Sequence, residues 1–140
     1  MLKKEVQQLQ PDITNNLIMA EFYISAKKLD FEQINSLMDI CASYIRKSES
    51  FKFKEFAKDE WCISTNYIEC EDINTPLNLL EKQISNKREI INMINQAYSA
   101  ECGFVIVVKI TSDILPAIYY EREFIKLASE INASINMDFV

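Results

Sequence analysis

The chain has 140 residues, and 15 Lys and Arg against 21 Asp and Glu give it a formal net charge of −6 at pH 7. Net negative charge argues against a nucleic-acid-binding protein, because such proteins bind phosphates mainly through Lys and Arg. The absence of histidine and the presence of a single glycine exclude histidine-dependent nucleophilic triads and glycine-rich phosphate-binding loops.

The first sixteen residues are polar and show no firm periodicity, whereas residues 17–140 read as one α+β domain. The chain start has two lysines but no apolar run behind them, so we predict no secretory signal. The longest apolar run, Phe104 to Val108, is far too short to cross a bilayer. We therefore expect a cytoplasmic protein that does not interact with membranes.

Residues 17–25 alternate between apolar and polar side chains, which predicts a half-buried strand. Asp30 and Gln33 then form a capping-box pattern at the start of a helix. Apolar residues recur at helical spacing after them, so we predict a helix from Phe31 to about Arg46. Residues 51–54 alternate Phe and Lys, which fits either a short edge strand with lysines outward or a loop with aromatic anchors.

Residues 61–69 alternate again and predict a strand, with one face formed by Trp61, Ile63, Thr65 and Tyr67. Trp61 is the only tryptophan of the chain. It could stack on a ligand or anchor a partner, but its register with an apolar strand face favours a place in the core.

The clearest predicted element is one helix of about 22 residues, which begins with Thr75 as a cap and Pro76 at the first helical position and ends near Tyr98. Residues 103–111 are β-branched on both faces and predict a central strand. A helix over residues 121–132 and a final strand over residues 135–139 complete the chain. The predicted fold is a two-layer α+β sandwich, with a four- to five-stranded, mostly antiparallel sheet and about three helices on one face.

The four cysteines, Cys41, Cys62, Cys70 and Cys102, form no metal-binding spacing. Cys62 and Cys70 lie on one predicted strand, about 26 Å apart if it is extended, and cannot form a disulfide without a turn between them. We therefore predict buried free thiols, no metal site and no cofactor.

Acidic residues flank the predicted strand over residues 61–69 at both ends: Asp59, Glu60, Glu69, Glu71 and Asp72. Paired carboxylates can hold a hard metal ion or act as acid and base. Charges beside a helix start are more often simply solvated and favourable for the helix dipole. We predict that these five residues form a partner-binding surface rather than a catalytic or metal site.

The order of motifs resembles the bacterial family called domain of unknown function 4279. The resemblance covers about residues 17–140 and rests on "EFYIS", "LDFEQINSLMDI", "DEWCIST", "LNLLEKQISNKREIINMI", "FVIVVKI" and "LPAIYYEREFIKLASEINASINMDFV". Trp61 followed by Ser64, and Asp138 near the end, match landmarks of the family. Between Leu37 and Lys58 the chain lacks the glycine and proline that members often carry. The family implies no enzymatic activity or cofactor, and some relatives resemble immunity proteins encoded near toxins.

We therefore expect a non-catalytic protein-binding domain rather than an enzyme. Its most concrete version is an immunity-type protein that neutralises a bacterial toxin by occlusion, with an acidic surface meeting a basic cleft. The alternative is a domain that senses a small ligand in a pocket between sheet and helices, which a ligand-induced rise in melting temperature would reveal. The sequence leaves the oligomeric state open, including a homodimer formed through an exposed strand edge.

Overall fold

The structure of the chain is a computed structural model, and it describes residues 15–50 and 57–140. The possible strand over residues 51–54 lies outside the described residues. The strands are β1 (Asn16–Ala26), β2 (Tyr44–Arg46), β3 (Asp59–Ser64), β4 (Ile68–Cys70), β5 (Glu101–Lys109) and β6 (Ser134–Phe139). The helices are α2 (Phe31–Met38), α3 (Asn74–Ile84), α4 (Arg88–Tyr98) and α5 (Arg122–Glu130), with 3₁₀ turns at Ser48–Ser50 and Ser85–Lys87.

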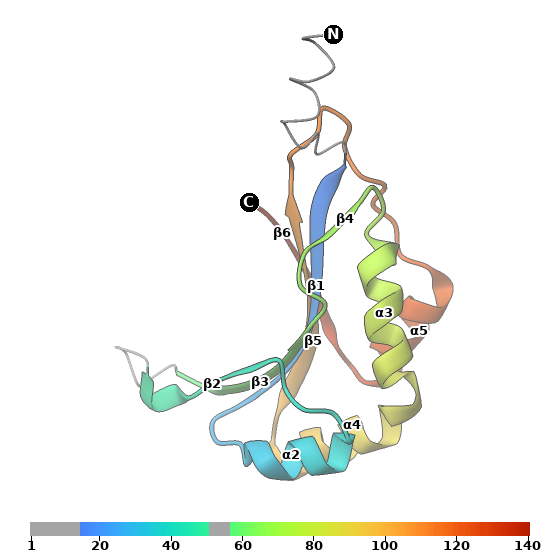
Figure 1. Cartoon of the computed structure of the whole chain (residues 1–140). Coiled ribbons are helices and arrows are strands. Elements are labelled where there is room, and N and C mark those ends of the chain that lie inside the picture. Colours follow the sequence, from blue (N-terminus) through green and yellow to red (C-terminus); the bar gives the residue numbers. More distant parts are fainter. Residues whose placement is uncertain (1–14, 51–56) are drawn as a thin grey trace, which may run out of the picture.

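Within the described residues, six strands form one sheet in the order β2-β3-β1-β5-β6, with β4 also paired to β1. All pairs are antiparallel except the parallel pair of β5 and β6. Helices α3 and α5 lie along one face of the sheet, and α2 and α4 lie at its lower end in Figure 1. The predicted two-layer α+β fold is confirmed, with more strands than the four to five expected.

The core lies between the sheet and the helices. Strand β1 contributes every second side chain to it, from Ile18 to Ile24. The ring of Phe104 on β5 packs at a tilt against Phe22 of β1 and edge-to-face against Phe124 of α5. The predicted core position of Trp61 is confirmed, since its side chain is 0% exposed. Its indole Nε1–H donates to Asn35 Oδ1 of α2 over 2.7 Å, which satisfies the one polar atom that burial would otherwise leave unpaired.

The first predicted helix is too long. Helix α2 ends at Met38, where Asp39 takes a left-handed conformation (φ 53°) and caps it. Residues 44–46, which the helical pattern included, instead pair with β3 as strand β2. Asn35 stabilises the segment between α2 and β2, because its Oδ1 also accepts the Ala42 N–H. Pairing to a neighbouring strand therefore outweighs the local helical periodicity here.

The predicted strand over residues 61–69 is broken. Ser64 lies opposite Glu21 and Ile68 lies opposite Ile18, so three residues, 65–67, face two residues of β1. This extra residue is a bulge, centred on Asn66 with φ 61°, and a bulge resets the alternation of side chains. Tyr67 consequently leaves the core face predicted for it and is 44% exposed.

The predicted long helix is also interrupted. A 3₁₀ turn at Ser85–Lys87 separates α3 from α4, at a polar stretch whose Ser and Asn side chains compete for backbone hydrogen bonds. As a result α3 packs on β1 and α5, whereas α4 turns away to contact α2 (Figure 1). The predicted helix over residues 121–132 and the last strand are found with small shifts of their ends.

Candidate functional site

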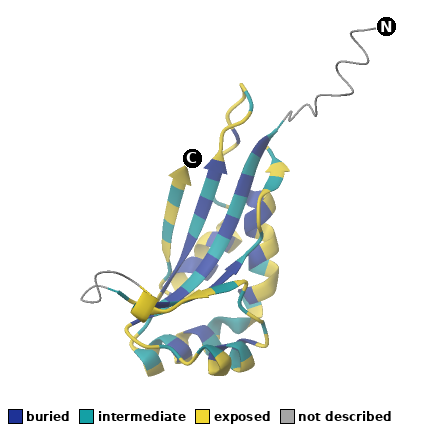
Figure 2. Ribbon diagram, turned by 60° about the vertical axis from the view of Figure 1, so that its left-hand side comes forward, coloured by how far each residue is buried: buried dark blue, intermediate teal, exposed yellow. Residues whose placement is uncertain are grey.

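Among the described residues, no helix covers one face of the sheet, and we call this face the open face. It is formed by the side chains of β1 at Met19, Glu21, Tyr23 and Ser25 and by their neighbours across the register. Figure 2 views the sheet from this side, and the dark blue and teal bands along β1 mark residues that face the helices and the open face in turn. The side chains of β1 on the open face are half-buried rather than fully exposed, because they pack against their neighbours on the adjacent strands.

Glu21 lies at the centre of the open face. Its Oε2 accepts the Tyr44 hydroxyl over 2.5 Å and lies 3.5 Å from the Cys62 thiol. Tyr44 and Cys62 are directly opposite each other on β2 and β3, so the cluster spans three strands. None of the ion pairs between described residues includes Glu21, and its side-chain hydrogen-bond partners among the same residues are the Tyr44 hydroxyl and the Cys62 thiol.

The two donors in this cluster are held in their neutral forms. Burial raises the pKa of the Cys62 thiol to about 12, and the negative charge of Glu21 adds to the effect. Burial likewise raises the pKa of Tyr44 well above its usual value, helped by its hydrogen bonds to Cys62 and Glu21. At neutral pH both groups therefore act as hydrogen-bond donors rather than as nucleophiles or bases.

Tyr23 lies flat against the backbone of the neighbouring strand, over Gly103. A Cβ at position 103 would lie 2.5 Å from the Tyr23 hydroxyl oxygen and 2.6 Å from its ring carbon Cζ. Gly103, the only glycine of the chain, therefore permits the phenol ring to cross β5. Burial, together with the charge of Glu60, raises the pKa of Tyr23, so this ring is also neutral at pH 7.

A hollow of about 340 Å³ opens on this face, lined by Met19, Glu21, Tyr23, Tyr44, Arg46, Glu60, Val105, Val107 and Asp138. At its rim Arg46 pairs with Glu60 over 3.6 Å, and its guanidinium lies 5.5 Å from the centre of the Tyr44 ring. Asp138 belongs to none of the ion pairs between described residues. The hollow thus combines aromatic rings with two carboxylates, those of Glu21 and Asp138, that belong to no ion pair among the described residues.

The five acids predicted as a partner surface are not brought together. Glu60 lies opposite Ser25 and Glu69 lies opposite Leu17, so both face the open side but sit about 27 Å apart along β1. Glu69 reaches this face only because the bulge shifts the alternation. Glu71 is exposed in the turn before α3.

Asp72 and Asp59 have structural partners. Asp72 Oδ1 accepts the backbone N–H and the side-chain amide of Asn74, the first residue of α3, over 2.9 and 3.0 Å. The predicted cap, Thr75, lies inside the helix instead. Asp59 is 7% exposed and faces away from the open side. Its two carboxylate oxygens accept the Leu29 and Ser48 N–H groups over 2.9 and 2.8 Å.

These bonds predict a pH dependence of stability. Burial opposes ionisation of Asp59, but the Ser48 and Leu29 N–H groups outweigh it and lower its pKa. A lowered folded-state pKa adds stability that is present above the unfolded-state pKa and is lost as pH falls through the folded-state pKa. We expect Asp59→Asn to lower the free energy of unfolding by about 2 kcal/mol at pH 7, and the difference to narrow below about pH 4.

Urea unfolding of both proteins between pH 3 and pH 7 measures this difference. Glu71→Gln removes an exposed carboxylate and should leave the unfolding free energy nearly unchanged at every pH. If the difference in unfolding free energy between the wild type and Asp59→Asn stayed constant from pH 7 to pH 3, ionisation of Asp59 would not be the source of its stabilising effect.

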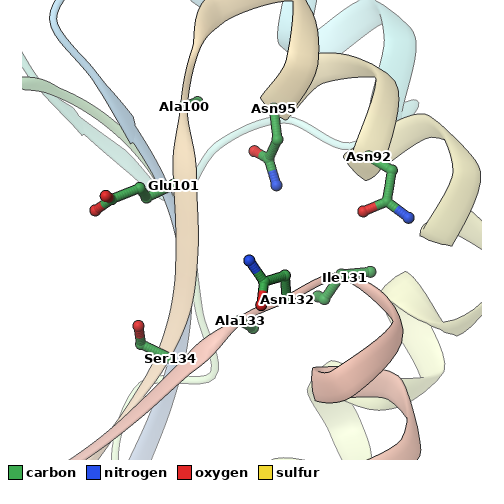
Figure 3. A pocket seen from close by; sticks show the side chains of 8 residues that line it. All are labelled: Asn92, Asn95, Ala100, Glu101, Ile131, Asn132, Ala133 and Ser134. Atoms are coloured by element: carbon green, nitrogen blue, oxygen red, sulfur yellow. The ribbon is translucent and has the colours of Figure 1, made fainter.

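A second hollow of about 490 Å³ lies between α4, the start of β5 and the turn after α5. Figure 3 shows the amide side chains of Asn92, Asn95 and Asn132 on one side of β5, while Glu101 points away on the other side. Asn95 Oδ1 is buried without a hydrogen-bond partner, and its amide nitrogen donates to Cys102 Sγ over 3.3 Å. Sequence patterns did not indicate this site, because Asn132, which follows α5, lies far along the chain from Asn92 and Asn95 of α4.

The predicted buried thiols are confirmed only in part, since Cys62 and Cys102 are buried whereas Cys41 is exposed and Cys70 half-buried. Across residues 15–50 and 57–140, no three His, Cys, Asp or Glu side chains are placed to hold a metal ion. In the same ranges no helix combines the length and apolar character needed to cross a bilayer.

One family model matches the sequence, that of the Domain of unknown function (DUF4279), and it covers residues 15–140. The chain belongs to this family. The resemblance drawn from "DEWCIST" and the C-terminal motifs is therefore confirmed, and the DUF4279 match begins one residue before β1. Neither the curated proteins nor the solved structures contain a match to the chain.

Proposed function

We propose that this DUF4279 protein is a non-catalytic binding domain that receives a basic segment of another protein on its open face. The observation that supports this most directly is the hollow bordered by Glu21 and Asp138, two carboxylates outside the ion pairs of the described residues. A Lys or Arg side chain entering this hollow would form charge-assisted hydrogen bonds to either carboxylate.

The aromatic rings of the hollow fit the same kind of partner. Arg46 already places its guanidinium over the Tyr44 ring, which is a favourable cation–π arrangement. Tyr23 lies in the next position across the sheet, opposite Cys62, and offers a second ring beside Glu21. An arginine of a partner could repeat on Tyr23 the contact that Arg46 makes on Tyr44.

The protonation states of the cluster support binding rather than catalysis. A nucleophilic cysteine needs a lowered pKa, whereas that of Cys62 is raised to about 12. Tyr44 is also kept neutral, and its hydroxyl is already committed to Glu21. These groups hold the Glu21 carboxylate in place for a ligand.

The most concrete version of this function is an immunity-type protein of the bacterial cytoplasm that covers a basic toxin cleft. A net charge of −6 would speed the encounter with a basic partner by electrostatic steering. Blocking a toxin cleft requires a complementary surface but no catalytic residue, and the open face offers such a surface.

The open face predicts which charge reversals affect partner binding. We expect Asp138→Lys to slow association with a basic partner by about tenfold or more and to weaken its salt dependence. Glu71→Lys changes the net charge equally but lies in the turn before α3, so association should remain within about twofold of wild type. Affinity capture from the native host would supply the partner, and surface plasmon resonance at several salt concentrations would measure the rates.

Equal effects of the two substitutions would contradict the open face as the binding surface, because net charge alone would then explain them. A captured partner that is acidic, or that binds both variants as well as wild type, would also count against the proposal.

Binding of a small ligand in the asparagine-lined hollow of Figure 3 is the second candidate function. It is favoured by the three amides around the hollow and by the unpaired Asn95 Oδ1. A small molecule that raises the melting temperature of wild type, but not of a variant with Asn132→Leu, would favour this candidate over protein binding.

A further inference from the structure

The outer edge of β6 is free of any strand in the described part of the chain. Strand β6 ends the sheet order β2-β3-β1-β5-β6, and Figure 2 shows it, ending at the label C, as the last strand on one side. The Val140 N–H donates to Val108 O of β5 over 3.0 Å. Since backbone groups alternate in direction along a strand, those of Ile135, Met137 and Phe139 point outward, away from β5.

This edge lacks the features that usually prevent pairing with another strand. Edge strands are commonly protected by lysines, prolines or bulges, and the sequence of β6, "SINMDF", contains neither Lys nor Pro. Its pairing with β5 runs without a bulge from Ser134 to Phe139. The only charge is Asp138, whose side chain lies on the open face.

Apolar side chains line the helix side of the same edge. Ile135 and Met137 are half-buried against the core, and Phe139 is 57% exposed. Ile125 of α5 is 50% exposed, and it lies on the flank of α5 opposite Glu130, which contacts Arg88 and Asn92 of α4. Ile125 therefore lies on a flank of α5 turned away from α4 and adds an exposed apolar side chain to the helix side of the sheet.

We propose that a second copy of the chain pairs antiparallel with β6, with Met137 at the two-fold axis. In this register Ile135 faces Phe139 of the partner subunit, and Asn136 faces Asp138 of the partner subunit. All three outward-pointing residues then exchange backbone hydrogen bonds. Apolar side chains meet apolar ones, a carboxylate meets an amide, and no like charges stand directly opposite.

This self-complementarity is the reason to name a second copy as the occupant. In an isologous interface the same segment of both subunits pairs with itself in the opposite direction, so its residues must be complementary about the central one. The sequence "SINMDF" meets this condition about Met137 on both faces of the sheet. The two sheets would join into one, with helices on the same side and both open faces side by side. The inference does not depend on the proposed function.

Sedimentation equilibrium over a range of concentrations tests the proposal. Wild type should approach twice the 16.3 kDa mass of one chain. Phe139→Pro removes an N–H that points outward and adds a ring at the edge, so we expect it to weaken the dimer at least about tenfold more than Phe139→Ala, which keeps that N–H. A monomeric wild type, or a dimer equally stable in both variants, would overturn the proposal. Circular dichroism would check that each variant is folded.

Disulfide trapping tests the register independently of these variants. In a background with Cys41→Ser, Met137→Cys should form a linked dimer under mild oxidation, because opposed residues lie about 5.5 Å apart between Cα atoms, within disulfide reach. Asn136→Cys places its thiols diagonally, about 7–8 Å apart, and should link far more slowly. Linking of Asn136→Cys in preference to Met137→Cys would contradict this register.

Discussion

Replacing Trp61 by alanine is expected to lower the free energy of unfolding by about 3–5 kcal/mol, a large part of the roughly 5–15 kcal/mol of an ordinary domain. The side chain is 0% exposed, so its removal leaves a cavity in the core. It also removes the Nε1–H that Asn35 Oδ1 accepts. Urea unfolding followed by far-ultraviolet circular dichroism would measure the loss without using tryptophan fluorescence.

Two further variants make this result interpretable. Trp61→Phe keeps most of the apolar volume and removes the indole N–H, so it should cost about 1–3 kcal/mol and remain folded if the alanine variant does not. Tyr67→Ala removes an aromatic ring that is 44% exposed, beyond the bulge, and should change stability by less than about 0.5 kcal/mol. Similar losses for Trp61→Ala and Tyr67→Ala would contradict this account of the strand.

The comparison of Trp61 with Tyr67 shows where sequence reasoning succeeds. Alternation correctly placed Trp61 and Ile63 in the core because they lie on one uninterrupted stretch of β3. It failed at Tyr67 because a single extra residue opposite β1 reverses the alternation. No local pattern marks such a bulge, since the conformation of Asn66 is fixed by pairing on both sides of it.

The two predicted helices that were too long end early for different reasons. Residues 44–46 carry a helical pattern, yet β3 offers them a strand partner, and contacts of that range cannot be read from local spacing. The break at Ser85–Lys87 does have a local signal, because Lys87 interrupts the apolar stripe of the long helix. Elements with strong patterns and no competing partner, such as β1 and α5, were predicted nearly to their ends.

The candidate site on the open face depends strongly on how the strands are aligned with one another in the sheet. Glu21 meets Tyr44 and Cys62 only because β1, β3 and β2 are aligned side by side, and the sequence separates Glu21 from them by 23 and 41 positions. The predicted acids were neighbours in sequence, but the bulge and the alternation direct Asp59, Glu60 and Glu69 to different places. Gly103 could have served as a signal, since a lone glycine in a β-branched strand indicates a close approach.

Asn16 was grouped with the polar N-terminal segment, but it is the first residue of β1 and is 0% exposed. Its Oδ1 accepts the Thr111 and Ser112 N–H groups over 3.0 and 3.1 Å, and its Nδ2 donates to Ile114 O over 2.7 Å. In the structure the alternation of β1 extends to Asn16, on the buried face, where a polar side chain needs such partners. The sequence prediction began the strand one residue later and missed it.

We expect Asn16→Ala to lower the free energy of unfolding by about 3 kcal/mol, because three hydrogen bonds to backbone groups after β5 are lost and each contributes about 0.5–1.5 kcal/mol. Asn78→Ala, which replaces an exposed asparagine of α3, should change the free energy of unfolding by less than about 0.5 kcal/mol. Urea unfolding would give both values, and amide hydrogen exchange should speed up at Thr111 and Ser112 in Asn16→Ala alone. Unchanged exchange at these two amides would show that Asn16 does not hold the segment, whatever the change in global stability.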